Sequence, residues 1–220
     1  MTTVERSTPV RPGEPAADFA LPALHQDGLV SLADYRGKCP VLLALFRGLN
    51  CAFCRRSIAQ LGATRERLQG AGVEVLAITA TPVERARLYL RFHPARVPLA
   101  ADPDMVTHRA YGLPTSQMTP ELIQHIQPLY VDLAREANMP VSETASLLEI
   151  SKALGRLDGF EIADADWAVG SSSTLTGQFL VDARGIVCWA NVEGTGEGSA
   201  ALGKFPTAEE LLAATRSLPR

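Results

Sequence analysis

Two cysteines, Cys51 and Cys54, flank an Ala-Phe dipeptide at a spacing that suits either redox chemistry or half of a zinc site. A zinc site needs two further ligands, which usually come as a second close pair. Cys39 and Cys188 stand alone, and the four histidines are scattered along the chain. We therefore expect a dithiol–disulfide pair at residues 51–54, with no metal and no cofactor. Because unpaired cysteines are commonly buried, Cys39 and Cys188 are interpreted as packing residues.

A predicted strand and a predicted helix place this pair. The continuous apolar run at residues 41–46 is typical of a strand buried on both faces of a mostly parallel sheet. After the short loop 47–50, a helix is expected to begin at Cys51, with Asn50 as its N-cap. Cys51 would then lie at an exposed tip, and Cys54 would lie one turn deeper on the apolar side of the helix.

The start of a helix stabilises a thiolate, because unpaired N–H groups and the positive end of the helix dipole lie there. Such a position lowers the pKa of a cysteine from about 8.5 to about 3.5–7.5. Arg47, Arg55 and Arg56 add positive charge nearby. We expect Cys51 to attack the substrate and Cys54 to resolve the intermediate. The alternative is that both cysteines are ordinary buried side chains.

Length and composition are those of an ordinary globular protein. The chain has 220 residues, of which 46% are hydrophobic and 20% are charged, and this length suits one enlarged domain. A net charge of −3 indicates no basic surface for nucleic acid or an anionic membrane. No apolar run is long enough to span a bilayer, and residues 1–10 lack a signal-peptide pattern. We expect a cytoplasmic protein.

Predicted strands and helices alternate along much of the chain, which indicates a parallel α/β sheet. The polar residues 1–14 are expected to form a flexible N-terminal tail, and residues 15–220 a single domain. Two late strands on either side of Gly185 predict an antiparallel hairpin. The predicted strands are 41–46, 73–79, 97–100, 178–182 and 186–192, and the predicted helices are 51–69, 83–92, 104–111 and one that begins at Thr207.

Residues 113–169 break this alternation. Apolar residues recur every three or four positions after Thr119, and Pro120 suits the first turn of a helix. A second helix is expected from Ser142 to about residue 154. We interpret the stretch as a helical insertion that covers one side of the sheet or forms a subunit contact, because the strands resume after it.

Several segments occur in an order and spacing that one family shares. They are Ala17–Pro22, Leu32–Lys38, Leu45–Gly48 running into the cysteine pair, Val97–Pro103, Ala110–Gly112, and Phe179–Asp182 with Gly185. Through them the chain resembles the alkyl hydroperoxide reductase/thiol-specific antioxidant (AhpC/TSA) family, the peroxiredoxin-like branch of the thioredoxin superfamily. The resemblance covers about residues 13–112 and 175–217. It implies an α/β, thioredoxin-like fold with a central mixed sheet flanked by helices.

The resemblance also implies thiol-dependent reduction of hydroperoxides or disulfides, with electrons from a thioredoxin- or glutathione-like donor. Ala44 and Gly48 occupy the places of the proline and threonine that usually precede the attacking cysteine of a peroxiredoxin. Thr176 occupies the place of the family's second arginine, and Arg47 is the candidate to replace that arginine. The supporting residues expected around the cysteines are therefore Arg47, Asn50, Arg55 and Thr176.

Three functions remain open at this point. The first is a peroxiredoxin-like thiol oxidoreductase that uses Cys51 and Cys54. The second is a thioredoxin-type protein disulfide reductase without peroxidase activity, which the retained Cys54 favours. The third is a non-enzymatic redox sensor or binding protein whose partner surface would be the helices 119–137 and 142–154. The apolar stripes of those helices equally suit ordinary core packing or a homodimer contact.

Overall fold

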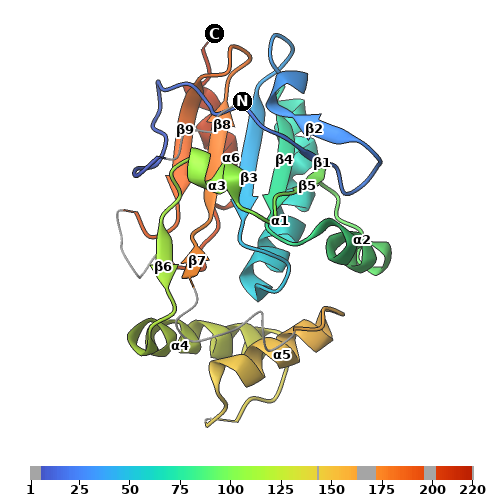
Figure 1. Cartoon of the computed structure of the whole chain (residues 1–220), viewed down its shortest axis with the longest axis vertical. Helices are drawn as coiled ribbons and strands as arrows, with labels where there is room; N and C mark the ends of the chain where they lie inside the picture. The colour runs from blue at the N-terminus through green and yellow to red at the C-terminus, as the bar shows by residue number, and fades with distance from the viewer. Residues whose placement is uncertain (1–5, 143, 163–171, 196–201, 220) are drawn as a thin grey trace.

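A computed structural model describes residues 6–142, 144–162, 172–195 and 202–219. Its centre is a five-stranded sheet with the strand order β5-β4-β3-β8-β9 (Figure 1). β3, β4 and β5 run parallel, whereas β8 is antiparallel to β3, and β9 is antiparallel to β8. The mixed sheet and the late hairpin expected from the sequence are thus confirmed. The strands are β3 (Val41–Phe46), β4 (Glu74–Thr79), β5 (Leu99–Ala101), β8 (Gly177–Val181) and β9 (Val187–Val192).

The central strand β3 is buried on both faces, as its continuous apolar sequence predicts. Each of its residues is at most 1% exposed. Leu42, Ala44 and Phe46 face one hydrophobic core, and the alternate residues face a second core on the other side of the sheet. The first core is covered by α1 (Ala52–Gly70), α2 (Val83–Phe92) and α6 (Ala208–Ala214); the second is covered by α3 (Val106–Ala110) and the N-terminal strands β1 (Ala20–Pro22) and β2 (Leu29–Ser31). The short 3-10 helices are η1 (Leu32–Asp34) and η4 (Thr215–Ser217).

The N-terminal segment differs from the flexible tail expected over residues 1–14. The backbone N–H of Val10 donates to the carbonyl of Tyr111 at 3.0 Å, and that of Gly13 donates to Val187 at 2.8 Å. The Val10 side chain is 1% exposed. Residues 6–14 are therefore held against the sheet by backbone hydrogen bonds and one buried apolar side chain; residues 1–5 lie outside the described residues.

The stretch after α3 contains two helices, α4 (Pro120–Glu136) and α5 (Leu147–Leu157). Thr119 caps α4 as predicted, since its hydroxyl accepts the N–H of Leu122. α5 begins later than predicted, because Ser146 and Glu149 form a capping box four residues beyond Ser142. A short strand β6 (Thr115–Gln117), not foreseen from the sequence, pairs with β7 (Ser172–Thr174), so no described residue of this stretch joins the main sheet.

The two helices lie beyond one end of the sheet. Figure 1 shows α4 and α5 beneath the end at which β3 finishes and α1 begins. They form a third, smaller hydrophobic cluster with the start of α1. Among the described residues no helix is both long and apolar enough to cross a membrane, and no three of their His, Cys, Asp and Glu side chains come together as a metal site.

Candidate active site

Cys51 lies at the junction between β3 and α1. It is the N-cap residue of α1, and its Sγ accepts the backbone N–H of Cys54 at 3.3 Å. Asn50 is therefore not the N-cap, contrary to the prediction. The reason is a turn in which the Cys51 N–H donates to the Gly48 carbonyl at 3.1 Å, so that the helix begins one residue later and the sulfur itself satisfies an unpaired N–H group.

The loop before Cys51 is tight, and Gly48 permits it. A Cβ at residue 48 would lie 2.5 Å from Asn50 Oδ1 and 3.3 Å from Thr81 Oγ1. The hydroxyl of Thr81 also fixes the loop, because it accepts the Leu49 N–H at 2.7 Å. The absence of a side chain at residue 48 thus lets the Asn50 side chain fold back over the loop.

The two thiols have opposite electrostatic environments. The pKa of Cys51 is lowered to about 5, first by the hydrogen bond from the Cys54 thiol, and then by the positive charge of Arg47 and the Cys54 N–H, against the opposing effect of burial. Burial raises the pKa of Cys54 well above its ordinary value, and the neighbouring Cys51 thiolate raises it further. The lowered pKa of Cys51 favours its thiolate at neutral pH, whereas the raised pKa of Cys54 favours its protonated thiol.

Both cysteines are buried. Cys51 is 5% exposed and Cys54 is 1% exposed. The prediction that Cys51 stands at an exposed tip is wrong, because both cysteines pack into the first hydrophobic core, beside Phe46 and Leu49. Both cysteines are free thiols in this structure.

Arg47 is held beside the thiols by a buried carboxylate. Its guanidinium contacts Glu193 at 2.6 and 3.2 Å, and the Glu193 side chain is 1% exposed. Glu193 also accepts the Thr176 N–H at 2.9 Å, the Thr176 hydroxyl at 3.2 Å and the Gly203 N–H at 2.7 Å. Burial alone would raise the pKa of Glu193. The charge of Arg47 and the N–H groups of Gly203 and Thr176 outweigh that effect, so the pKa is lowered. Thr176 is thus placed in the site as a partner of Glu193.

Arg55 lies on the first turn of α1 but is bound away from the thiols. Its guanidinium forms an ion pair with Asp158 at 2.6 Å and donates to the carbonyls of Leu49 at 2.7 Å and Asn50 at 3.4 Å. Arg55 was expected to place a positive charge beside Cys51. Its guanidinium instead holds the loop and Asp158 together. Arg55 connects the cysteine loop to the residue that follows α5.

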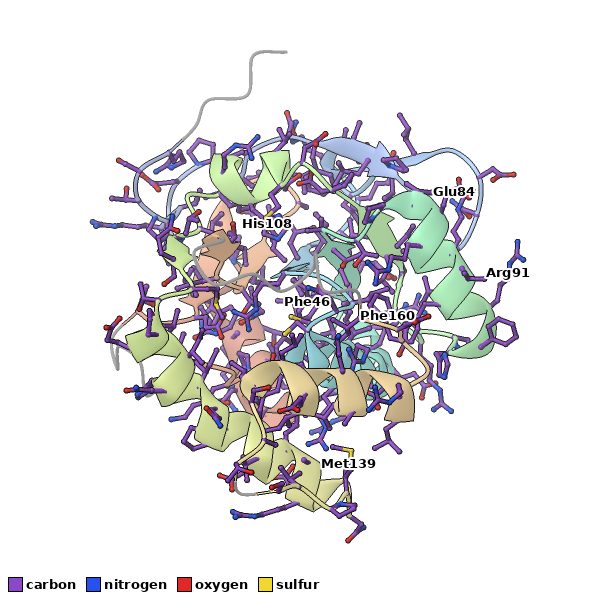
Figure 2. All side chains as sticks on the ribbon, turned by 60° about the horizontal axis from the view of Figure 1, so that its bottom comes forward. Phe46, Glu84, Arg91, His108, Met139 and Phe160 are labelled. Carbon is purple, nitrogen blue, oxygen red and sulfur yellow. The ribbon has the colours of Figure 1, made fainter. Side chains whose placement is uncertain are left out.

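Three groups near the site were not predicted as site residues from the sequence. Glu193 is one, and His108 is another: it is fully buried, with Nε2 3.1 Å from the Phe46 carbonyl and Nδ1 3.7 Å from Asp102 Oδ2, so it supports the end of β3. Tyr130 of α4 is the third. Its ring meets Phe53 edge-on at 5.0 Å between centroids and shares a buried cluster with Ala52. In Figure 2, α4 and α5 come forward, and the labels of Phe46 and Phe160 stand above α5.

Comparison with known proteins bears on the fold and the family. The sequence model of the AhpC/TSA family matches residues 12–190. No curated protein sequence matches the chain. Similar solved structures include the reduced 2-Cys peroxiredoxin of Plasmodium vivax, with TM-score 0.59, 16% identity and coverage of 94% of this chain and 81% of that one. The peroxidoxin BcpB of Mycobacterium tuberculosis has TM-score 0.58 and 13% identity, covering 96% and 99%.

A third similar structure, peroxiredoxin Q of Xanthomonas campestris, has TM-score 0.55 and 13% identity, and the match covers 90% of both chains. At such identities these structures support the fold, which they confirm as that of thioredoxin-fold peroxiredoxins. The family model adds the sequence evidence, since it spans most of the chain, including the strand, the loop and the cysteine pair. The chain belongs to the AhpC/TSA family.

Proposed function

We propose that this protein is a thiol-dependent oxidoreductase that reduces hydroperoxides, with Cys51 as the attacking and Cys54 as the resolving cysteine. One observation carries the proposal: two free cysteines lie together at the start of α1, where the sulfur of Cys51 accepts the Cys54 N–H at 3.3 Å. Cys51 has a pKa of about 5 beside Arg47, while burial holds the pKa of Cys54 high. The thiolate is the reactive form of cysteine, and neutral pH keeps Cys51 in it.

The chemistry proceeds in two balanced steps. The Cys51 thiolate attacks one peroxide oxygen, the O–O bond breaks, and the leaving alkoxide takes up a proton to give an alcohol, which leaves a sulfenic acid on Cys51. The sulfur of Cys54 then attacks the Cys51 sulfur, and its proton leaves with the hydroxyl as water. The Cys51–Cys54 disulfide is finally reduced by a thioredoxin- or glutathione-like thiol donor.

A second candidate is reduction of disulfides, which the resolving position of Cys54 favours. A thiolate at Cys51 can attack a disulfide sulfur as well as a peroxide oxygen, and Cys54 would then release the mixed disulfide. The departure at Gly48, where peroxiredoxins usually carry threonine, weakens the peroxide assignment. Arg47 supports it, because a fixed guanidinium beside the thiolate can stabilise the negative charge that develops on the leaving oxygen.

The reduced protein with Cys54→Ser separates these candidates. After brief exposure to hydrogen peroxide or to a small disulfide, alkylation and mass spectrometry locate the product. Peroxidase chemistry leaves a sulfenic acid on Cys51, whereas disulfide chemistry leaves a mixed disulfide there. Cys39→Ser serves as the matched control and should retain turnover. If Cys51 reacts with neither oxidant faster than a free thiol, the enzymatic assignment fails and a sensing or binding role replaces it.

A further inference from the structure

We propose that helices α4 and α5 form a cap over the reduced cysteine pair, that Tyr130 on this cap narrows the way to Cys51, and that the oxidising substrate is therefore a small hydroperoxide and not a protein disulfide. The inference rests on the proposed function and assigns the size class of its substrate. Both cap helices lie in the stretch between β6 and β7.

Burial at the start of α1 is the first argument. The first turn of a helix that follows a loop at the edge of a sheet is ordinarily open to solvent, and a reactive thiol needs that access. Here Cys51 is 5% exposed, Ala52 is 1% exposed and Cys54 is 1% exposed. Ala52 belongs to the same hydrophobic cluster as residues of both cap helices, namely Tyr130, Leu133, Ala134, Leu147, Ile150 and Leu154. The cap therefore lies directly on the segment between the two sulfurs.

Tyr130 is the cap residue best placed to control access. Its ring packs edge-on against Phe53 with 5.0 Å between centroids, and the side chain is in the buried cluster with Ala52. Burial raises the pKa of the Tyr130 phenol, and the negative charge of Cys51 raises it further, which agrees with a position close to the thiolate. A large ring at this point fills space that a bulky oxidant would need.

Hydrogen bonds and an ion pair connect the cap to two arginines of α1. Arg56 donates to the Glu136 carboxylate at 2.6 Å and to the Leu133 carbonyl at 3.1 Å, both on α4. Arg55 forms its ion pair with Asp158 at the end of α5. The cap cluster, which contains Ala52, is separate from the two cores of the main sheet, the first of which contains Cys51 and Cys54. Loosening the cap should therefore change access to Cys51 while leaving the sheet intact.

Substrate size follows from this arrangement. Attack on a protein disulfide requires the sulfur, its flanking backbone and neighbouring side chains to approach Cys51 closely, in line with the S–S bond. In the proposed arrangement α4 and α5, which pack on the neighbouring Ala52, stand in that approach. A hydroperoxide needs room only for its terminal O–O group.

Size-dependent labelling tests the cap without relying on catalysis. In a Cys39→Ser/Cys188→Ser background, Cys51 is labelled with N-ethylmaleimide and, separately, with a polyethylene-glycol maleimide of protein size. Each rate is divided by that of the same reagent on the unfolded chain. We expect the small reagent to be favoured at least about tenfold, as for a thiol reached by the large reagent only through local opening.

Two variants should abolish this preference. Tyr130→Ala removes the ring. Arg56→Ala removes the two hydrogen bonds between α1 and α4 that involve this exposed side chain. If one variant folds poorly by circular dichroism, the other remains informative. Arg67→Ala is the matched control, because Arg67 also lies on α1 but pairs with Glu209 of α6, at 3.2 Å and away from the cap. It should leave the size preference unchanged.

A redox arm distinguishes failure of the cap from failure of the proposed function. Reduced protein is mixed with hydrogen peroxide and with a disulfide-bonded protein, and loss of free Cys51 is followed. Fast peroxide oxidation with slow protein-disulfide oxidation, and a faster disulfide reaction in the two cap variants, supports the proposal. Equal rates with both oxidants in the unmodified protein, or no change in the variants, overturn it. A retained size preference without peroxide oxidation overturns the proposed function instead.

Discussion

The carboxylate of Glu193 holds the guanidinium of Arg47 at 2.6 Å, and this pair joins the residue that follows β9 to the loop that precedes Cys51. Glu193 is 1% exposed and Arg47 is 21% exposed at the side chain. Because the pair is largely desolvated, removing one partner leaves an uncompensated charge in the site. Arg47 in turn is the charged side chain that lowers the pKa of Cys51.

Glu193→Gln should destabilise the protein by about 2–4 kcal/mol, since the partly exposed Arg47 would remain without its counter-ion. Thr176→Val removes only the hydroxyl that donates to Glu193 at 3.2 Å and keeps the N–H bond. That variant should cost about 1 kcal/mol. Urea denaturation of the reduced proteins measures both values. Equal effects of the two substitutions would contradict the importance given to the ion pair.

The thiolate of Cys51 should titrate near pH 5. Its absorbance at short ultraviolet wavelength is expected to rise through a midpoint near the pKa of about 5, and its alkylation rate should follow the same curve. Cys54→Ala removes the hydrogen bond that contributes most to this low pKa, so the midpoint should move toward that of a free thiol. Cys39→Ala leaves the pair intact and should not move it. An unchanged midpoint in Cys54→Ala would contradict the assigned cause.

The same pKa predicts how stability depends on pH. The Cys51 thiol ionises near pH 5 when folded and near its ordinary value of 9.0 when unfolded. Between these values the unfolded chain binds the extra proton, so the contribution of Cys51 is fully present above pH 9 and is lost as the pH falls to 5. The Cys51–Cys54 disulfide form has no such thiol. Denaturation of the reduced and the oxidised protein at several pH values measures the effect. The free energy of unfolding of the reduced form, relative to the oxidised form, should rise between pH 5 and pH 9.

Gly48 and Asn50 should be coupled. An alanine at residue 48 would bring its Cβ to 2.5 Å from Asn50 Oδ1, which forces the Asn50 side chain or the loop to move. Gly48→Ala should therefore cost about 1–3 kcal/mol and slow the reaction of Cys51. Adding Asn50→Ala should recover most of both losses, as a double-mutant cycle would show. Additive effects would mean that the loop tolerates the side chain in another way.

The sequence predicted those parts of the fold that depend on local pattern. The apolar run of β3, the helix start at the cysteine pair and the Thr119 cap each lie within a few residues of their signal, and the structure contains them. The N-cap was predicted at Asn50 but is Cys51, one residue later. The turn at Gly48 depends on a backbone hydrogen bond that residue types do not reveal.

The rest of the site depends on distant residues. Glu193 lies 146 positions from Arg47, and Asp158 lies 103 positions from Arg55. In the sequence each is one acid among many, and only the sheet order and the position of α5 bring it to its partner. The same holds for Tyr130, whose helical period predicted a buried face of α4 but not that this face would lie on Ala52. Exposure of Cys51 was therefore overestimated.

The two cysteines should have unequal roles, and their order of reaction tests this directly. Cys51 carries the thiolate at the helix start, while burial raises the pKa of the thiol of Cys54 one turn further on. Only the thiolate is a good nucleophile near neutral pH, so brief alkylation of the reduced protein should label Cys51 first.

Substitution should then separate attack from resolution. Cys51→Ser should lower turnover by at least about a thousandfold, because the attacking atom is lost. Cys54→Ser should keep the first oxidation but stop before the disulfide, leaving Cys51 as a sulfenic acid after peroxide. Mass spectrometry of each variant after alkylation and after oxidant reads both outcomes. Prior labelling of Cys54, or full activity in Cys51→Ser, would reverse the roles. The low pKa of Cys51 would then reflect its role as the N-cap of α1. The attacking group would have to be the more deeply buried thiol of Cys54, and the cap would have to open further to expose it.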